Sequence, residues 1–465
     1  MDFIQRVKKA TTGAAASRTM LLANFEVEES WAEGETTLPR VGSENAAAIV
    51  NRMDEFGIWL AEGEDTVLLK EAPDPAYLEG IERQGFEVPK MLVVGQHSPM
   101  SKITTDARNN PSTLREASRL AGEGVMMLPH SLSVAESDLC RDIGIAVAGP
   151  SDDVCRRVNG KVFSRRLADS MGIRQPAGVA TEDLDDWKRA VESARSLLQD
   201  GRTAVVKEAY GVSGKGIAVV KSEQRLNRLD AIVTQRAESN GGRAMFSVEE
   251  WVNKSVDLNF QFTLGRDGAT HFDFIKLAET ARGVHLGHSY PAALSAAHVD
   301  EIELTAERIA SKLRSEGYFG VVGVDSIIDD AGVVYPMLEI NARFNMSTYQ
   351  AKIDQRVDAQ NAVARAKHFT LQLGAPLTYL TLQGLLAECL FTAERPAGLV
   401  INNFATVNAA FGDGDFEAQS APAARPRAST QGRLYGVIVG QDAEAVDRLD
   451  AEISARLERS YGRAA

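Results

Sequence analysis

Three polar residues at alternate positions end one apolar run of the sequence, "YPMLEINARF", which extends from Tyr335 to Phe344. They are Glu339, Asn341 and Arg343. Because successive side chains of a β-strand point to opposite faces, this carboxylate, amide and guanidinium would point in one direction. Such a strand either has a solvated edge or presents the three groups to a ligand.

The run "VVGVDSII" places Asp325 in a second apolar strand, and "DDAG" (Asp329–Gly332) follows it as a turn. We therefore expect a β-hairpin that brings Asp325 close to Glu339 and Asn341. Oxygen ligands without His or Cys suit Mg²⁺ or Mn²⁺ that bridges phosphates. Arg343 on the same face could hold a carboxylate or a developing phosphoryl charge. The alternative is a structural polar network.

The stretch "YGVSGKGIAVV" places Gly211, Gly214 and Gly216 between two runs typical of strands. Glycines let backbone N–H groups approach phosphate oxygens closely, and Ser213 could add a donor. A P-loop is excluded because Ala209 stands where its first glycine belongs, and the glycine order does not fit a dinucleotide fingerprint. An ordinary hairpin with a flexible tip is the alternative.

Two lysines accompany this glycine loop. Lys207 lies in the apolar run "AVVKEA", where burial without a paired anion is costly, unless the strand is at an edge. Lys161 lies near the start of an expected helix, Val158–Ile173, in which Asn159 and Gly160 are plausible first residues. A lysine at such a position is most often a solvated surface residue.

The segment "SVEEWVNKSVDLNF" combines carboxylates with apolar residues: Glu249, Glu250, Trp251, Val252 and Asp257. An adenine needs a backbone acceptor, a backbone donor and apolar walls, and ribose hydroxyl groups need a carboxylate acceptor. This segment could supply all of them. Acidic pairs are otherwise typical of solvated faces.

The elements that must position these groups follow from hydrophobic patterns. Short apolar runs at Arg18–Phe25 and Lys90–His97, with a helix at Ala135–Gly144, indicate an α/β domain with buried parallel strands that ends near Pro150. We expect further strands at Met245–Asn253 and Leu258–Leu264. After a helix at Glu301–Glu316 and the hairpin, the chain should end with a loop (Gln419–Gly432), a strand (Arg433–Gly440) and a helix.

Composition narrows the class of protein. The chain has 465 residues, which favours two to four domains. Its formal net charge of -13 argues against general binding to nucleic acid or anionic membranes. Its three cysteines lack close metal-ligand spacing, and no apolar stretch is long enough to span a bilayer. We expect a cytoplasmic protein.

In order and spacing, these motifs resemble the ATP-grasp superfamily of carboxylate–amine and carboxylate–thiol ligases. The resemblance covers roughly Ser151 to Lys367, and the preceding α/β region looks like a pre-ATP-grasp domain. The last hundred residues, with "GRLYGVIVG", are similar to the pheganomycin-type peptide ligases. The implied fold is α/β (α+β), with a pre-ATP-grasp domain at 1–150, an ATP-grasp catalytic domain at 151–370 and a small α+β region at 371–465.

The resemblance also implies cofactors and residue roles. ATP and Mg²⁺ (or Mn²⁺) would bind, with metal ligands Asp325, Glu339 and Asn341. Lys161 and Lys207 would bind the phosphates, and the Gly211–Gly216 loop, with Ser213 and Gly214, would close over the nucleotide. Glu249 or Glu250, with the backbone of Trp251 and Val252, would hold adenine. Asp257 would bind the ribose.

Two departures from relatives concern catalysis. D-Alanine ligases have an arginine two residues before the first metal aspartate, where this chain has Gly323, so Arg343 or Arg282 would stabilise the intermediate. Biotin carboxylases continue the Glu-x-Asn-x-Arg element with a Glu-His pair that "FNMSTYQ" lacks here.

Arg282 should face the substrate carboxylate. Its neighbours His285 and His288 suggest either a metal site or, as we expect, a surface loop.

The implied activity is ATP-dependent formation of an amide or peptide bond through an acylphosphate, with release of ADP and phosphate. The substrates would be small carboxylates and amines, such as amino acids or peptides of specialised metabolism. Three rivals remain: loading of an amino acid on a carrier-protein thiol, a small-molecule kinase, and a nucleotide-binding regulatory protein. Dimers are common in this superfamily, which leaves a homodimer open.

Overall fold

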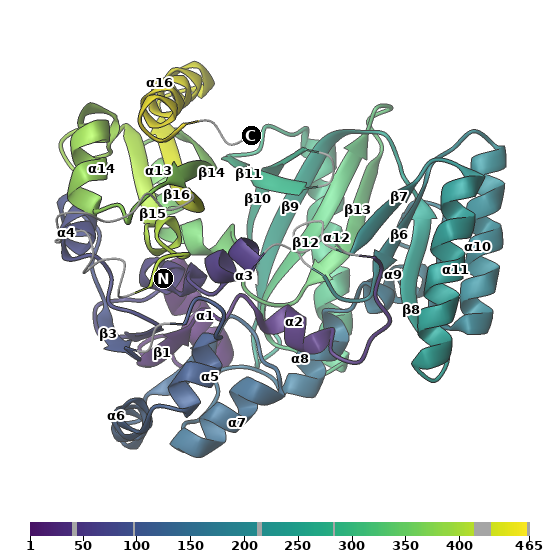
Figure 1. The fold of residues 1–465 in the computed structure, drawn as a ribbon, viewed down its shortest axis with the longest axis horizontal. Coiled ribbons are helices and arrows are strands. Elements are labelled where there is room, and N and C mark those ends of the chain that lie inside the picture. The colour runs from purple at the N-terminus through teal and green to yellow at the C-terminus, as the bar shows by residue number, and fades with distance from the viewer. Residues whose placement is uncertain (40–43, 96–97, 212–215, 282–283, 413–428, 463–465) are drawn as a thin grey trace.

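The computed structural model describes residues 1–39, 44–95, 98–211, 216–281, 284–412 and 429–462. Within this part of the chain the strands form three sheets, two with four strands and one with eight. Figure 1 shows the first sheet with its helices in purple and blue, the second at the opposite end of the molecule, and the large sheet between and above them. No helix in these ranges is long and apolar enough to cross a membrane.

The N-terminal sheet is parallel, with the order β3-β2-β1-β4. Its strands are β1 (Thr19–Leu22), β2 (Thr66–Leu69), β3 (Lys90–Val93) and β4 (Met126–Pro129). Strands β1 and β2 are buried at every position, as expected when helices cover both faces of a parallel sheet. The helices here are α2 (Val27–Trp31), α3 (Glu44–Val50), α4 (Pro75–Arg83), α5 (Ile103–Arg108), α6 (Pro111–Gly122) and α7 (Val134–Ile143). The predicted α/β organisation is confirmed, and helix α7 ends at Gly144, whose φ of 78° suits glycine.

The second sheet is antiparallel, with the order β5-β8-β6-β7. It consists of β5 (Gly178–Asp183), β6 (Ala204–Glu208), β7 (Ile217–Val220) and β8 (Arg243–Glu250). Helices α10 (Leu184–Gln199) and α11 (Glu223–Ser239) pack on it around a core that contains Trp187 and Phe246 (Figure 1).

The eight-stranded sheet has the order β13-β12-β9-β10-β11-β14-β16-β15. Its strands are β9 (Lys254–Leu264), β10 (Thr270–Ala281), β11 (Val284–Tyr290), β12 (Gly320–Asp329), β13 (Val334–Asn341), β14 (Val363–Leu373), β15 (Gly398–Asn403) and β16 (Thr430–Gly440). Strand β14 runs across residue 370, so the sheet continues into the last hundred residues. The division of domains at that residue stays a prediction. The expected loop at Gln419–Gly432 is wrong at its end, because residues 430–432 pair with β14.

The remaining helices of the described residues precede, link or follow these strands. They are α1 (Phe3–Thr12), α8 (Asp152–Val158), α9 (Lys161–Met171), α12 (Ala296–Ser315), α13 (Ala351–Ala359), α14 (Tyr379–Leu386) and α16 (Ala443–Tyr461). Short 3₁₀ segments occur at η1 (Met53–Trp59), η2 (Thr348–Gln350), η3 (Ala387–Cys389) and η4 (Ala405–Val407). Helix α9 begins at Lys161 with Gly160 as its N-cap, as predicted.

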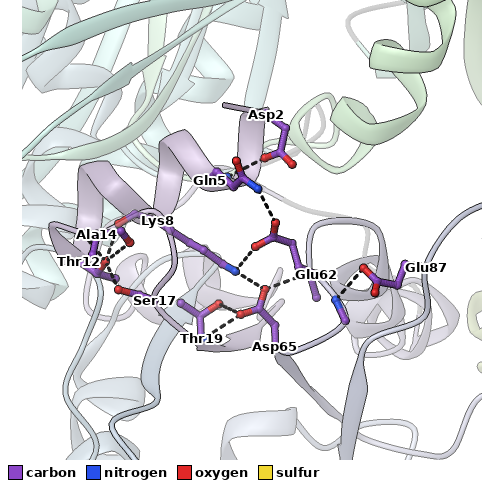
Figure 2. Close-up of polar contacts among 12 residues, drawn as sticks. Asp2, Gln5, Lys8, Thr12, Ala14, Ser17, Thr19, Glu62, Asp65 and Glu87 are labelled. Carbon is purple, nitrogen blue, oxygen red and sulfur yellow. Dashed lines mark hydrogen bonds and ion pairs between the residues drawn. The ribbon is translucent and has the colours of Figure 1, made fainter.

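Helix α1 lies between the N-terminal sheet and the large sheet, and a buried ion pair attaches it to the N-terminal side. Lys8 on this helix contacts Glu62 and, at 2.7 Å, Asp65 (Figure 2). Asp65 is fully buried and also accepts hydrogen bonds from the backbone and hydroxyl of Thr19 at the start of β1. The opposite side of α1 reaches the large sheet, where the backbone of Arg266 donates to the carbonyl of Ala10.

We predict that Lys8→Met destabilises the protein by about 3–5 kcal/mol, because the substitution leaves the buried carboxylate of Asp65 without its cation. Lys9→Met is the matched control, since Lys9 is exposed on the same turn. Denaturant unfolding of both variants measures the difference. Equal stabilities of the two variants would contradict this account of the interface.

A buried carboxylic acid, Glu26, follows β1 at the carboxyl edge of the parallel sheet. Its pKa is raised from 4.5 to about 8, first by burial and then by the like charges of Glu136 and Asp54. A backbone hydrogen bond and Lys102 oppose this rise without cancelling it. Between these two pKa values the folded state binds more protons than the unfolded state, so stability falls as pH rises.

We predict that Glu26→Gln flattens this pH dependence. The difference in the free energy of unfolding, variant minus wild type, should become more positive by roughly 3–5 kcal/mol from about pH 4.5 to about pH 8. Glu33→Gln, at an exposed position, serves as the control. Urea titrations at a series of pH values measure the effect, and parallel pH profiles for Glu26→Gln and the wild-type protein would contradict it.

Candidate active site

A cavity of about 340 Å³ lies where the three sheets meet. The N-terminal sheet region, helix α9, the small sheet and the large sheet all contribute to its wall. The polar residues that line it are Glu28, His130, Lys161, Lys207, Lys254, Asp257, Asn259, Thr280, His288, Asp325, Ser326, Glu339, Asn341, Arg343, Asn345 and Ser347.

The β12–β13 hairpin places Asp325 directly opposite Glu339 in the antiparallel register. Asn341 lies two residues further along β13, and its amide donates to Asp325 Oδ2 at 3.2 Å. From the neighbouring strand β9, Asn259 donates to Asp325 Oδ1 at 2.9 Å. The expected hairpin therefore brings the three proposed metal ligands together.

The charge of this acidic group suits a divalent cation. Burial, and then the charge of Glu339, raise the pKa of Asp325 to about 6, although hydrogen bonds from Asn259 and Asn341 oppose the rise. Two facing carboxylates repel one another unless a cation lies between or beside them. Carboxylate and amide oxygens are hard ligands, so the donor set fits Mg²⁺ or Mn²⁺.

Lys161 places a protein cation beside this group. Its ammonium is 2.7 Å from Glu339 Oε1 and donates to the carbonyl of Gly211 at 2.8 Å. The residue is only 5% exposed, so a solvated surface lysine is excluded. Burial alone would lower its pKa, but Glu339 and Glu28 outweigh this effect and the pKa is raised.

Lys207 lies on β6, between β8 and β7, so it is not on an edge strand. Its ammonium is 2.5 Å from Glu249 Oε2 on β8. Burial alone would raise the pKa of Glu249, but Lys207 outweighs it and the pKa is lowered. A protein carboxylate thus compensates the charge that we expected an anionic ligand to neutralise.

The segment after β8 is held by backbone hydrogen bonds. Glu250 N–H donates to the carbonyl of Ala177 at 2.7 Å, and Trp251 N–H donates to that of Thr203 at 2.8 Å. The Glu250 carboxylate pairs with Arg202 at 2.9 Å. Trp251 lines the cavity, and its backbone N–H is already engaged.

Asp257 on β9 also lines the cavity, where it contacts the ammonium of Lys254 and the hydroxyl of Thr280. Of the glycine loop, Gly211 lines the cavity and Gly216 has a φ of 80°. Ser213 and Gly214 lie outside the described residues, as does Arg282.

Arg343 lies two residues beyond the end of β13, so the strand period does not determine its direction. Its side chain nevertheless faces the same cavity. Nη2 donates to Asn341 Oδ1 at 2.8 Å and contacts Glu28, and Nη1 donates to Asn345 Oδ1 at 3.2 Å. This guanidinium therefore connects the metal-ligand group with the N-terminal region.

The segment with the two histidines is not a surface loop, and that expectation is wrong. Residues 284–290 form β11, which pairs with β10 and, through His288, with Ala366 on β14. His288 is 6% exposed and lines the cavity. The loop interpretation failed because β14, far along the sequence, covers this strand. The side chain of His285 lies outside the described residues.

Comparison with known families agrees with this arrangement. A pre-ATP-grasp domain model matches residues 54–145, and an ATP-grasp domain model matches residues 166–344. The chain thus carries a pre-ATP-grasp domain followed by an ATP-grasp domain. The resemblance inferred from the motifs is thereby confirmed.

Two curated ATP-grasp relatives illustrate the range of the family. The butirosin acyl-carrier-protein–L-glutamate ligase of Niallia circulans is 24% identical, over 83% of this chain and 85% of its own length. Human mitochondrial pyruvate carboxylase is 26% identical over 56% of this chain. The matched region makes up only 22% of that enzyme.

Solved structures share the fold. Biotin carboxylase from Campylobacter jejuni has a TM-score of 0.52 at 14% identity and covers 96% of this chain and 97% of its own. The N5-carboxyaminoimidazole synthetase of Staphylococcus aureus has a TM-score of 0.50 at 12% identity. That match covers 95% of this chain and 98% of the synthetase chain.

Several residues of the ATP-grasp cavity were missed from the sequence. Asn259 interrupts the apolar strand "LNFQFTL", a signal that could have been used. Glu28 and His130 come from the N-terminal region and carry no motif. Burial, and then Arg343, lower the pKa of His130 well below its usual value, and its Nδ1 lies 2.9 Å from the hydroxyl of Tyr349.

We predict that Glu339→Gln in this ATP-grasp hairpin abolishes substrate-dependent phosphate release. The substitution keeps the shape of the side chain but removes the negative charge that faces Asp325 and Lys161. Circular dichroism at the assay temperature checks that the variant is folded, because the substitution also leaves the buried Lys161 without its carboxylate partner. Glu301→Gln, on the surface of α12, is the control. Substantial phosphate release by Glu339→Gln would contradict a role for this carboxylate in metal binding.

Proposed function

We propose that this protein joins a carboxylate to an amine through an acylphosphate, with release of ADP and phosphate, and that the acid component is an amino acid or peptide. The observation that carries the proposal is the meeting, in one cavity, of Asp325, Glu339 and Asn341 with Lys161 and Arg343. Hard metal ligands beside fixed cations are what transfer of a γ-phosphoryl group requires.

The lysines act on the phosphates of ATP. Lys161 and Lys207 each pair with a carboxylate, Glu339 and Glu249, in the protein alone. Phosphate oxygens would take over these ammonium groups, and Glu339 would turn to the metal with Asp325 and Asn341. Bound Mg²⁺ or Mn²⁺ would neutralise charge that develops on the transferred group.

The nucleoside would occupy the segment after β8. Trp251 provides an apolar wall, Val252 and the carbonyl of Glu250 provide backbone groups for adenine, and Asp257 accepts hydrogen bonds from the ribose. Glu249 acts through Lys207. The Gly211–Gly216 loop, with Ser213 and Gly214, would contribute backbone donors to the phosphates.

Ligation then needs two further steps. The substrate carboxylate attacks the γ-phosphorus and ADP leaves, which yields the acylphosphate. The amine attacks the acyl carbon, and phosphate leaves after a tetrahedral intermediate. Arg343 is placed to hold the carboxylate and the developing oxyanion, and we propose that Arg282 assists at the substrate end.

A second candidate is transfer of the acyl group to the thiol of a carrier protein. The relative from Niallia circulans is named as a ligase that acts on an acyl-carrier protein, and it aligns with most of this chain. Both reactions share the acylphosphate and differ only in the nucleophile.

A panel of carboxylic acids and amines, incubated with ATP and Mg²⁺, tests the proposal. We expect acid-dependent release of ADP and phosphate and an amide product by mass spectrometry. AMP and pyrophosphate would contradict the acylphosphate route, and a stable phosphate ester would identify a kinase. Product formed only with a phosphopantetheine-bearing carrier protein would identify the thiol as acceptor.

A further inference from the structure

Glu28 gives the cavity a carboxylate that belongs to the N-terminal region. It lies on α2, the short helix that follows β1, and Trp31 on the same helix is buried and donates its indole N–H to the carbonyl of Leu132 at 2.9 Å. This contact fixes the helix against the strand end of β4. Of the residues that this region contributes to the cavity wall, Glu28 is the one with a carboxylate.

The partner of Glu28 is the guanidinium of Arg343. Its Nη2 contacts Glu28 Oε1, and the two side chains are 11% and 9% exposed. Nη1 is occupied by the carbonyl of Phe344 at 2.9 Å and by Asn345. Nε of Arg343 is buried and has no hydrogen-bond partner among the described residues. A carboxylate could therefore bind the Nε–Nη2 edge of the guanidinium if Glu28 moved aside.

Apolar side chains from three segments line the same cavity as this ion pair. The first segment is Phe25, which precedes α2. The second contains Val50 at the end of α3 and Met53 at the start of η1, and the third is the loop after β13, which contains Met346. Phe25 contacts the rings of His130 and Tyr349, with centroid distances of 4.5 Å and 5.0 Å. The wall can thus accept an apolar group next to a cation and an anion.

We propose that Arg343 and Glu28 together recognise the carboxylate and the ammonium of a free α-amino acid with an apolar side chain. In an α-amino acid these two charges are attached to one carbon, so the groups that bind them must lie close together, as Arg343 and Glu28 do. The zwitterion would insert between the two side chains and replace their mutual contact with two ion pairs. The inference rests on the proposed function, because it assigns the acid component of that reaction.

This arrangement also selects which carboxylate reacts. Arg343 is bonded to Asn341, one of the three proposed metal ligands, so a carboxylate held by Arg343 lies beside the γ-phosphate site. One of its oxygens forms the new bond to phosphorus, and the bond from phosphorus to the β-phosphate oxygen breaks with ADP. Glu28 keeps the ammonium protonated, so this amino group is not the nucleophile. The acid component would then be an amino acid rather than the carboxyl end of a peptide.

The test compares each amino acid with analogues that lack the positive charge of the ammonium group. Leucine, methionine and phenylalanine are assayed with ATP and Mg²⁺ against the acids without the amino group and against the N-acetyl amino acids. Hydroxylamine replaces the natural amine, so the acylphosphate is trapped as a hydroxamate. We expect wild-type kcat/KM to favour the free amino acids by at least about tenfold, since a buried carboxylate is left unpaired by the analogues.

Glu28→Gln should reduce this preference by at least about tenfold, mainly through KM, while binding of ADP stays close to wild type. The melting temperature should fall, because the buried Arg343 loses its carboxylate partner. Glu29→Gln is the matched control, because Glu29 is the exposed neighbour on α2. If Glu28→Gln does not fold, the wild-type comparison alone decides. Equal use of the blocked or amine-free acids, or an unchanged preference in Glu28→Gln, would overturn the inference and leave the ligase proposal standing. Absence of phosphate release with every acid would overturn both.

Discussion

The compensation of charge between facing side chains in the central cavity is the constraint on which the rest of the structure depends. Asp325 and Glu339 are opposite one another on adjacent strands, a placement that is unfavourable for two carboxylates. Lys161 and the amides of Asn259 and Asn341 offset it in the protein alone. These groups reach the cavity from α9, β9, β12 and β13, so the relative position of those elements is tied to this balance.

The same principle operates at the edges of the cavity. Lys207 is neutralised by Glu249 within the small sheet, and Arg343 by Glu28 across the boundary between the large sheet and the N-terminal region. A buried charge without a partner is strongly unfavourable, and for this reason a site built to bind anions needs temporary partners when empty. Exchange of these internal carboxylates for phosphate and substrate groups gives a physical route by which ligands would couple the three sheets.

The ATP-grasp domain, and the meeting of Asp325 with Glu339 and Asn341, could be predicted because they depend on local patterns. The period-two pattern in "YPMLEINARF" and the turn at "DDAG" determine a hairpin, and a hairpin determines which residues face each other. The capping position of Gly160 likewise places Lys161 at the start of α9. Local rules do less well where distant strands intervene: they predict a surface loop for β11, because β14, which covers it, lies about eighty residues further along.

What the sequence by itself determined is the set of chemical groups and their order: two lysines, a glycine loop, an acidic segment, and a hairpin with a carboxylate on each strand. Only the tertiary structure decided which groups are partners. Glu28 and Arg343 are 315 positions apart, and nothing in the spacing of either residue indicates their contact. The reason is physical, because hydrogen-bonded local elements form from neighbouring residues, whereas burial of opposite charges depends on how those elements pack.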